Sequence, residues 1–263
     1  MAKSLSSRGA SVVLAARSEN KLNRIQNEIE SDGGRVIAVT TDIKDRNACK
    51  TLVDKTAVTL GGVDGIILNA GISMWANFED ISNPSFFQKL MDVNYMGAVN
   101  CVHASLPVLI KSKGVIVSIT TAQALMGFPA HAGYAASKHA LRGFTETLEI
   151  ESDGKVKFMD AYLGWIKGTD LRANAFGADG EKLGASKHTH GSHAIELDDC
   201  VNGIIKGMAA GKRRVYTPRK LRMIPILNIF ARGWLQRKVS KAVKDHNKSV
   251  SYTHLTLPTK RIV

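Results

Sequence analysis

The sequence is poor in the features that mark several common classes of protein. Its three cysteines, Cys49, Cys101 and Cys200, are widely spaced and form no CxxC pair. This spacing excludes the usual thiolate metal and redox motifs and favours a reducing compartment. No run of eighteen apolar residues occurs, so we expect no membrane-spanning segment, and the first residues show no signal-peptide pattern. One domain with a single sizeable core is the better expectation for 263 residues.

Acidic residues are scarce near the C-terminus. Residues 212–248 contain twelve Lys or Arg and one acid, Asp245, so most of the net charge of +13 lies there. Such an excess indicates affinity for anionic surfaces rather than a particular fold. We expect no nucleic-acid partner. We divide the chain into a domain at 1–211, a basic amphipathic extension at 212–249, and a tail at 250–263.

What the sequence does contain is a regular alternation of strand and helix patterns. Buried strands are predicted by short apolar, β-branched runs at residues 11–16, 35–40, 65–68 and 115–119. Helices are predicted at residues 18–29, 46–60, 84–94 and 97–111, and a further one opens near Tyr134. Strands that alternate with helices of this length predict βαβ units, and hence an α/β fold with a doubly wound parallel sheet.

Tyr134 and Lys138 are the first candidates for chemistry. They lie four residues apart, on one face of the predicted helix, and Thr121 lies thirteen residues earlier at the end of a predicted strand. A phenol beside a cation has the parts of a general acid or base, because the positive charge favours the phenolate. The alternative is an ordinary helix with one exposed Lys and one half-buried Tyr.

Polar or small residues follow four successive predicted strands. In a parallel sheet of this kind, ligands bind at the carboxyl ends of the strands. The candidates there are Arg17, Asp42, the turn Asn69-Ala70-Gly71, and Thr121. The pattern indicates one binding site at that edge of the sheet.

Four short motifs carry a resemblance to a known family. They are LNAG at 68–71, DVNYMG at 92–97, SITT at 118–121 and YAASK at 134–138. With them the chain resembles the short-chain dehydrogenase/reductase family, whose members have a nicotinamide-dependent Rossmann fold. The segment at 162–175, the loop at 178–185 and the basic tail resemble in particular the branch of 11-beta-hydroxysteroid dehydrogenase and dehydrogenase/reductase member 7B.

The resemblance implies catalytic roles. Tyr134 would exchange a proton with the substrate oxygen, and Lys138 would lower the pKa of Tyr134 and hold the nicotinamide ribose. Asn94 would hold a water that links Lys138 to solvent, unless it only bonds its own helix backbone. Thr121 replaces the family's serine; its hydroxyl can still donate, but the extra methyl narrows the pocket, so we expect reduced or shifted activity. The alternative is that Ser118 or Thr120 supplies this hydroxyl, but strand alternation points both side chains elsewhere.

The resemblance also implies how a cofactor would bind. Arg17 follows the strand that ends in Ala16, where an acid would accept the adenosine ribose hydroxyls, so a 2′-phosphate and NADP(H) are favoured over NAD(H). The alternative is that Arg17 is a solvated surface residue that does not bind the 2′-phosphate. Asp42 would accept from the adenine amino group or cap a helix. Asn69, Ala70 and Gly71 would let the backbone approach the cofactor, and Ile166 and Thr169 would close over it, although the spacing of Thr169 is one residue too long.

Two further segments have competing interpretations. His188, His190 and His193 suggest a metal site, but no carboxylate or Cys lies at ligand spacing, so a solvated loop without metal is preferred. Residues 220–241 mix apolar and basic residues, which is typical of a helix on an anionic membrane surface. The alternative is a helix that closes the substrate mouth.

Both ends of the sequence depart from the family pattern. The family's first strand and its TGxxxGxG-type turn, whose amides would meet the cofactor pyrophosphate, have no counterpart, and any N-terminal anchor would also be missing. Residues 250–263 resemble translated sequencing adapter, with a genuine tail as the alternative. We therefore expect a fragment that, expressed alone, neither folds cooperatively nor binds cofactor.

The function expected from these features is NADP(H)-dependent oxidoreduction. A hydride would pass between nicotinamide and a secondary alcohol or ketone of a lipophilic substrate, such as a steroid, retinoid, lipid or xenobiotic carbonyl. The alternative is a non-catalytic scaffold or a membrane-surface binding protein. By resemblance we expect a homodimer or homotetramer through residues 97–111 and 134–152, located in the cytoplasm or on the cytoplasmic face of an intracellular membrane such as the endoplasmic reticulum.

Overall fold

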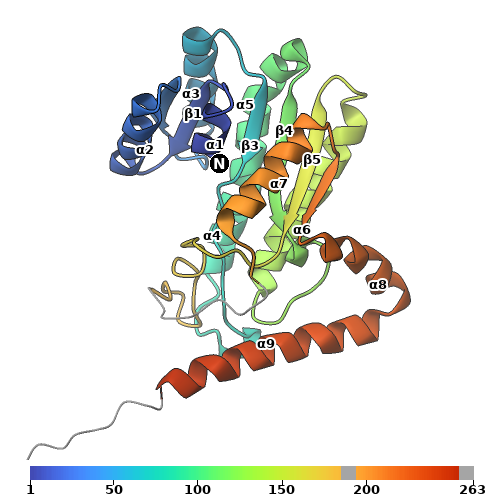
Figure 1. The fold of residues 1–263 in the computed structure, drawn as a ribbon. Coiled ribbons are helices and arrows are strands. Elements are labelled where there is room, and N and C mark those ends of the chain that lie inside the picture. The colour runs from blue at the N-terminus through green and yellow to red at the C-terminus, as the bar shows by residue number, and fades with distance from the viewer. Residues whose placement is uncertain (185–193, 255–263) are drawn as a thin grey trace, which may run out of the picture.

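The computed structural model describes residues 1–184 and 194–254, with side chains through Lys244. It is an α/β fold in which parallel strands are flanked by helices (Figure 1). The predicted fold class is therefore confirmed. The strands do not form one continuous sheet, however: two lie in one sheet and four in another.

The smaller sheet is formed by the first two strands. β1 (Val12–Ala16) pairs in parallel with β2 (Val36–Thr40), and α2 (Glu19–Ser31) crosses between them. α2 turns its apolar residues toward the strands, because Leu22 and Ile29 are buried in one cluster with Val12, Leu14 and Val36. The short helix α1 (Ala2–Ser6) covers the same cluster through Ala2 and Leu5.

The larger sheet has the order β3-β4-β5-β6, with every pair parallel. Its strands are β3 (Gly65–Leu68), β4 (Val115–Thr121), β5 (Lys157–Leu163) and β6 (Arg214–Thr217). β6 lies beyond the boundary expected at residue 211, because Arg214 to Thr217 continue the hydrogen-bond ladder of β5. Within the described residues β1 and β2 pair only with each other and β3 pairs only with β4, so each of these three strands has one edge without a strand partner.

Helices cover both faces of the strands. They are α3 (Arg46–Leu60), α4 (Phe86–Met91), α5 (Gly97–Ser112), α6 (Ala132–Glu151) and α7 (Leu197–Ala209). A π-helical turn, Asp92–Met96, joins α4 to α5 in one continuous helix from Phe86 to Ser112. That helix is long and apolar enough to cross a membrane by length and composition alone, but 44% of its most apolar window is buried inside the fold. Cys101, Val102 and Leu109 on this helix lie in a buried core cluster.

The contact between α3 and α5 joins the two sheets. Cys49 on α3 and Cys101 on α5 are buried against each other, with their sulfur atoms 3.8 Å apart. Asn100 on α5 donates from one amide nitrogen to the backbone carbonyls of Ile43 and Lys44, at 3.0 and 3.1 Å. Gly97 permits this close approach, because a Cβ there would lie 2.4 Å from the Ile43 side chain.

The C-terminal part of the chain forms two helices outside the sheet. α8 (Ile224–Phe230) follows a 3-10 turn at Arg219–Met223, and α9 (Arg232–His254) crosses the lower end of the molecule in Figure 1. Leu235 and Val243 are buried on α9, whereas its basic side chains up to Lys244 are exposed. Residues 250–254 continue α9, and the rest of the tail expected at 250–263 lies outside the described residues.

Candidate active site

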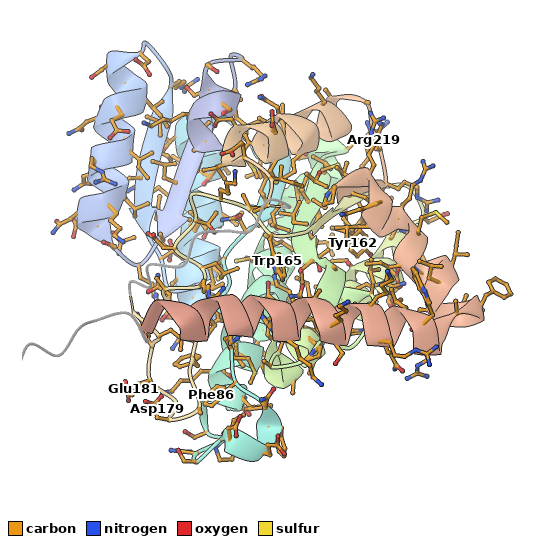
Figure 2. All side chains as sticks on the ribbon, turned by 60° about the horizontal axis from the view of Figure 1, so that its bottom comes forward. Phe86, Tyr162, Trp165, Asp179, Glu181 and Arg219 are labelled. Atoms are coloured by element: carbon orange, nitrogen blue, oxygen red, sulfur yellow. The ribbon has the colours of Figure 1, made fainter. Side chains whose placement is uncertain are left out.

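A cavity of about 780 Å³ opens at the carboxyl ends of the strands. β1, β3, β4 and β5 contribute to it through the residues at or just past their ends, which include Arg17, Asn69, Thr121 and Gly164. α6 contributes Tyr134 and Lys138, and the segment after β5 contributes Trp165, Ile166 and Thr169. Figure 2 shows Trp165 between the sheet and α9, in line with this position. The cavity therefore collects most of the predicted site residues at the expected edge.

Tyr134 and Lys138 both lie on the inner face of α6 and line the cavity. They are 7% and 4% exposed. The Lys138 ammonium donates to the Ile119 carbonyl of β4 at 2.9 Å, which fixes α6 against that strand. The Tyr134 hydroxyl has no hydrogen-bond partner among the described residues, yet it is not sealed in the core. A free phenol that faces a cavity can exchange a proton with a bound oxygen.

Burial sets the acidity of both groups. It raises the pKa of Tyr134 and lowers the pKa of Lys138 to about 8, because each loses solvation of its charged form. The phenol is therefore held protonated at neutral pH. The lowering of the Tyr134 pKa by Lys138, which the family resemblance implies, is not seen in this structure.

Asn94 lies in the π-helical turn and ties three elements together. Its amide nitrogen donates to the Ile72 carbonyl at 2.8 Å and to the Ser137 hydroxyl at 2.9 Å, and its oxygen accepts from the Ile72 amide at 2.8 Å. It does not bond its own helix, which was the alternative interpretation. A Cβ at Gly71 would lie 3.3 Å from the Asn94 oxygen and 3.7 Å from the Lys138 nitrogen. Gly71, Asn94 and Lys138 therefore meet at one point of the cavity wall.

Thr121 ends β4 and reaches the cavity, but its hydroxyl donates to the Gln123 carboxamide oxygen. Gln123 lies in the 3-10 turn Ala122–Ala124, and it is buried. The hydroxyls of Ser118 and Thr120 are buried without a hydrogen-bond partner in the described part of the chain. Ser118 does not line the cavity, whereas Thr120 does, contrary to the expectation from strand alternation.

Of the residues expected to bind the cofactor near its adenosine end, some line the cavity and others do not. Arg17 lines the cavity, and so does Lys44, which ion-pairs with Asp42 at 3.6 Å. Asp42 itself does not line the cavity: it accepts from the Lys44 amide, and Asp45 caps α3 instead. In the turn after β3, Asn69 and Gly71 line the cavity, whereas Ala70 is exposed outside it.

The segment after β5 forms the opposite wall. Ile166 pairs with Ile195 in an isolated β-bridge, and the Trp165 carbonyl accepts from the Ile195 amide at 2.9 Å, which holds Trp165, Ile166 and Thr169 beside the cavity. Further along, the loop near Asp179 and Glu181 lies against Phe86 (Figure 2). The wall thus comes from a segment far from β1 in the sequence.

Among the cavity residues that were not predicted from the sequence, three carry polar groups of particular interest. Lys44, Gln123 and His131 all line the cavity. Lys44 could have been predicted, because it lies two residues after Asp42 in the same loop that follows β2. Gln123 and His131 lie in the polar loop between β4 and α6, whose path no periodicity determines.

The histidines at 188, 190 and 193 lie outside the described residues. Among the residues that are described, no group of three His, Cys, Asp or Glu side chains lies close enough to hold a metal ion.

Comparison with protein families and curated proteins gives consistent matches. The family model described as short chain dehydrogenase matches residues 1–179. The protein named 11-beta-hydroxysteroid dehydrogenase-like 2 from Arabidopsis thaliana is 31% identical over 221 residues, which cover 82% of this chain and 68% of that protein.

Solved structures also resemble the fold. A short chain dehydrogenase/reductase from Burkholderia phymatum in complex with NAD has a TM-score of 0.73 and 21% identity, covering 85% of this chain and 86% of its own. A metagenomic short-chain oxidoreductase in complex with NADP has a TM-score of 0.58 and 26% identity, covering 63% of this chain and 76% of its own. These two structures contain different cofactors, so the likeness alone assigns neither to this chain.

Proposed function

Since this chain belongs to the short-chain dehydrogenase family, we propose that the full-length protein reduces a ketone on a lipophilic molecule to a secondary alcohol, with NADP(H) as the cofactor. The observation that carries the proposal is the meeting of Tyr134, Lys138 and Gly71 at one cavity, with Asn94 packed behind Gly71. Steroid, retinoid, lipid and xenobiotic carbonyls are the substrate classes included. The test is NADPH consumption matched by formation of the alcohol.

The two ends of a nicotinamide dinucleotide fit the residues present. Lys138 is a buried ammonium with one acceptor, the Ile119 carbonyl, among the described residues, so its remaining donors suit ribose hydroxyls. Gly71 beside it leaves the backbone open to approach. For the pyrophosphate, however, the described residues offer no glycine-rich turn at a helix N-terminus between β1 and β3. The cofactor would supply the hydride at nicotinamide C4.

The protonated state of Tyr134 suits the reduction of a ketone. Burial raises the pKa of Tyr134, so its phenol carries a proton at neutral pH and can give it to the oxygen of a ketone as that oxygen gains charge. The Thr121 hydroxyl, by contrast, already donates a hydrogen bond to the Gln123 side chain. Tyr134 is therefore the group we assign as the proton donor, with Thr121 shaping the wall beside it.

Arg17 and Lys44 support the preference for NADP(H). Both are exposed cations that line the cavity next to the ends of β1 and β2. In the full-length protein, Arg17→Ala is expected to weaken NADPH binding about tenfold, because a charge-assisted bond to the 2′-phosphate is lost, and to leave NADH binding roughly unchanged. Fluorescence titration with both cofactors measures this. Arg46→Ala, which removes an exposed cation outside the cavity, is the control, and equal losses for both cofactors would contradict the assignment.

A membrane surface is the second partner we propose. α8 and the start of α9 expose Ile226, Ile229, Phe230 and Trp234, with exposed fractions from 48% to 84%. Exposed basic side chains lie close to them in the sequence, namely Arg222, Arg232, Arg237 and Lys238. Apolar side chains that enter the interface and cations that contact anionic headgroups together favour binding to an anionic bilayer. This supports a location on the cytoplasmic face of an intracellular membrane.

Vesicle co-sedimentation tests the membrane surface. The double change Ile229→Glu and Phe230→Glu is expected to reduce binding to vesicles containing phosphatidylserine at least about tenfold. It removes apolar area that would enter the bilayer, and it places negative charge next to a negatively charged surface. Val58→Glu, at a site on α3 that is 86% exposed, should leave binding unchanged. Equal binding to vesicles of phosphatidylcholine alone would contradict the role of the basic residues.

Exposed apolar residues on α5 and α6 support a homodimer or homotetramer through these two helices. Ile110 on α5 is 41% exposed and Ile150 on α6 is 80% exposed. Burying both in a symmetric contact would remove apolar area from water.

A further inference from the structure

His131 occupies a position in the cavity wall that the catalytic proposal does not use. It precedes α6, three residues before Tyr134, and its ring centroid lies 6.1 Å from that of Tyr134. Trp75 and Phe128 pack against it edge-on, at 4.7 and 5.3 Å. The imidazole is therefore held in one orientation by aromatic neighbours.

The tautomer of His131 follows from its one hydrogen bond. Nδ1 lies 2.9 Å from the Pro129 carbonyl oxygen, and because a carbonyl only accepts, Nδ1 carries the proton. Burial lowers the pKa of His131 to about 4, so the ring is neutral at physiological pH. Nε2 is then a lone-pair acceptor. It has no partner among the described residues, and it is not sealed in the core.

Gln123 presents the complementary group on the Thr121 side of the cavity. Its carboxamide oxygen accepts from the Thr121 hydroxyl, so its amide nitrogen is left with two N–H donors. That nitrogen likewise has no partner within the described part of the chain. Gln123 and His131 are 7% and 4% exposed, so both are more than nine-tenths buried and both line the cavity.

Because Gln123 bonds Thr121 and His131 lies beside Tyr134 at the same cavity, we propose that Gln123 and His131 bind a hydroxyl group on the carbon next to the reacting carbonyl. The inference rests on the proposed function and narrows its substrate to an α-hydroxyketone. A hydroxyl donates to the lone pair of His131 and accepts from the amide of Gln123, whereas a methyl group does neither. A bound ketone without the hydroxyl would leave two buried polar groups unpaired, which sites of this kind penalise strongly.

A matched pair of ketones tests the proposal in the full-length protein. 2-Hydroxyacetophenone carries a hydroxyl where propiophenone carries a methyl. We expect kcat/KM with NADPH to be about tenfold or more higher for the hydroxyketone. His131→Asn keeps a donor for the Pro129 carbonyl but has no group at the position of Nε2, so the ratio should fall to near one. His131→Gln, which reaches that position with an acceptor oxygen, should restore part of it.

Nitrogen NMR of isotope-labelled histidine gives a second measurement that needs no turnover. The hydroxyketone should shift the His131 Nε2 resonance, and propiophenone should not. His139 is the internal control, because it lies on the same helix and makes the same kind of Nδ1 contact, to Ala135 at 2.9 Å, but is exposed outside the cavity. No shift at His131, or an equal shift with both ketones, overturns the inference. Turnover of both ketones at equal rates overturns it while the proposed function stands, whereas a selective shift without turnover supports it while the proposed function fails.

Discussion

Replacing Tyr134 by Phe in the full-length protein is expected to lower ketone reduction about 10³-fold or more, because the one phenol among the described residues that faces the cavity can no longer donate its proton. NADPH affinity should stay nearly the same, since Lys138 and Gly71 are untouched. The measurement is kcat/KM from NADPH consumption, together with the dissociation constant from fluorescence titration.

Tyr162→Phe is the matched control for this change. Tyr162 is a fully buried phenol on β5 whose hydroxyl lies 3.4 Å from Asp160, and it does not line the cavity. Its loss should affect stability more than turnover. Unchanged turnover in Tyr134→Phe would end the catalytic assignment, and a wild-type protein that consumes no NADPH with any carbonyl would favour the non-catalytic scaffold.

The sequence predicted the regular elements well because periodicity reports burial directly. The apolar run Gly65–Leu68 and the helix Arg46–Leu60 are found as predicted, since each has a clear apolar pattern and a Gly or Asp at its ends. The placement of Tyr134, Lys138 and Thr121 at one edge followed from the rule for parallel sheets.

The contacts inside the site were beyond prediction from sequence. The bond from Thr121 to Gln123 and the packing of His131 between Trp75 and Phe128 depend on how an irregular loop folds back. The π-helical turn at Asn94 likewise interrupts a pattern that reads as ordinary helix. In each case the deciding contact joins residues whose proximity is set by tertiary structure.

Residues 1–263 expressed alone are expected to melt broadly and to give no saturable quenching with NADPH. The physical reason is the division of the sheet. β1 and β2 form a two-stranded sheet that is marginal by itself, and no ladder of hydrogen bonds connects it to β3 in the described structure. The cavity takes Arg17 from one sheet and Thr121 from the other, so loosening of their connection also separates the two ends of the cofactor site.

Amide hydrogen exchange shows which part opens first. β4 and β5 lie inside the four-stranded sheet, so their amides should be protected far longer than those of β1 and β2. Asn100→Ala should widen the difference, because it removes the bonds from α5 to the Ile43 and Lys44 carbonyls, whereas Asn27→Ala, on the outer surface of α2, should not. Equal protection in both sheets, together with a sharp melt and saturable NADPH quenching, would show that packing between α3 and α5 is enough to make the divided sheet one cooperative unit.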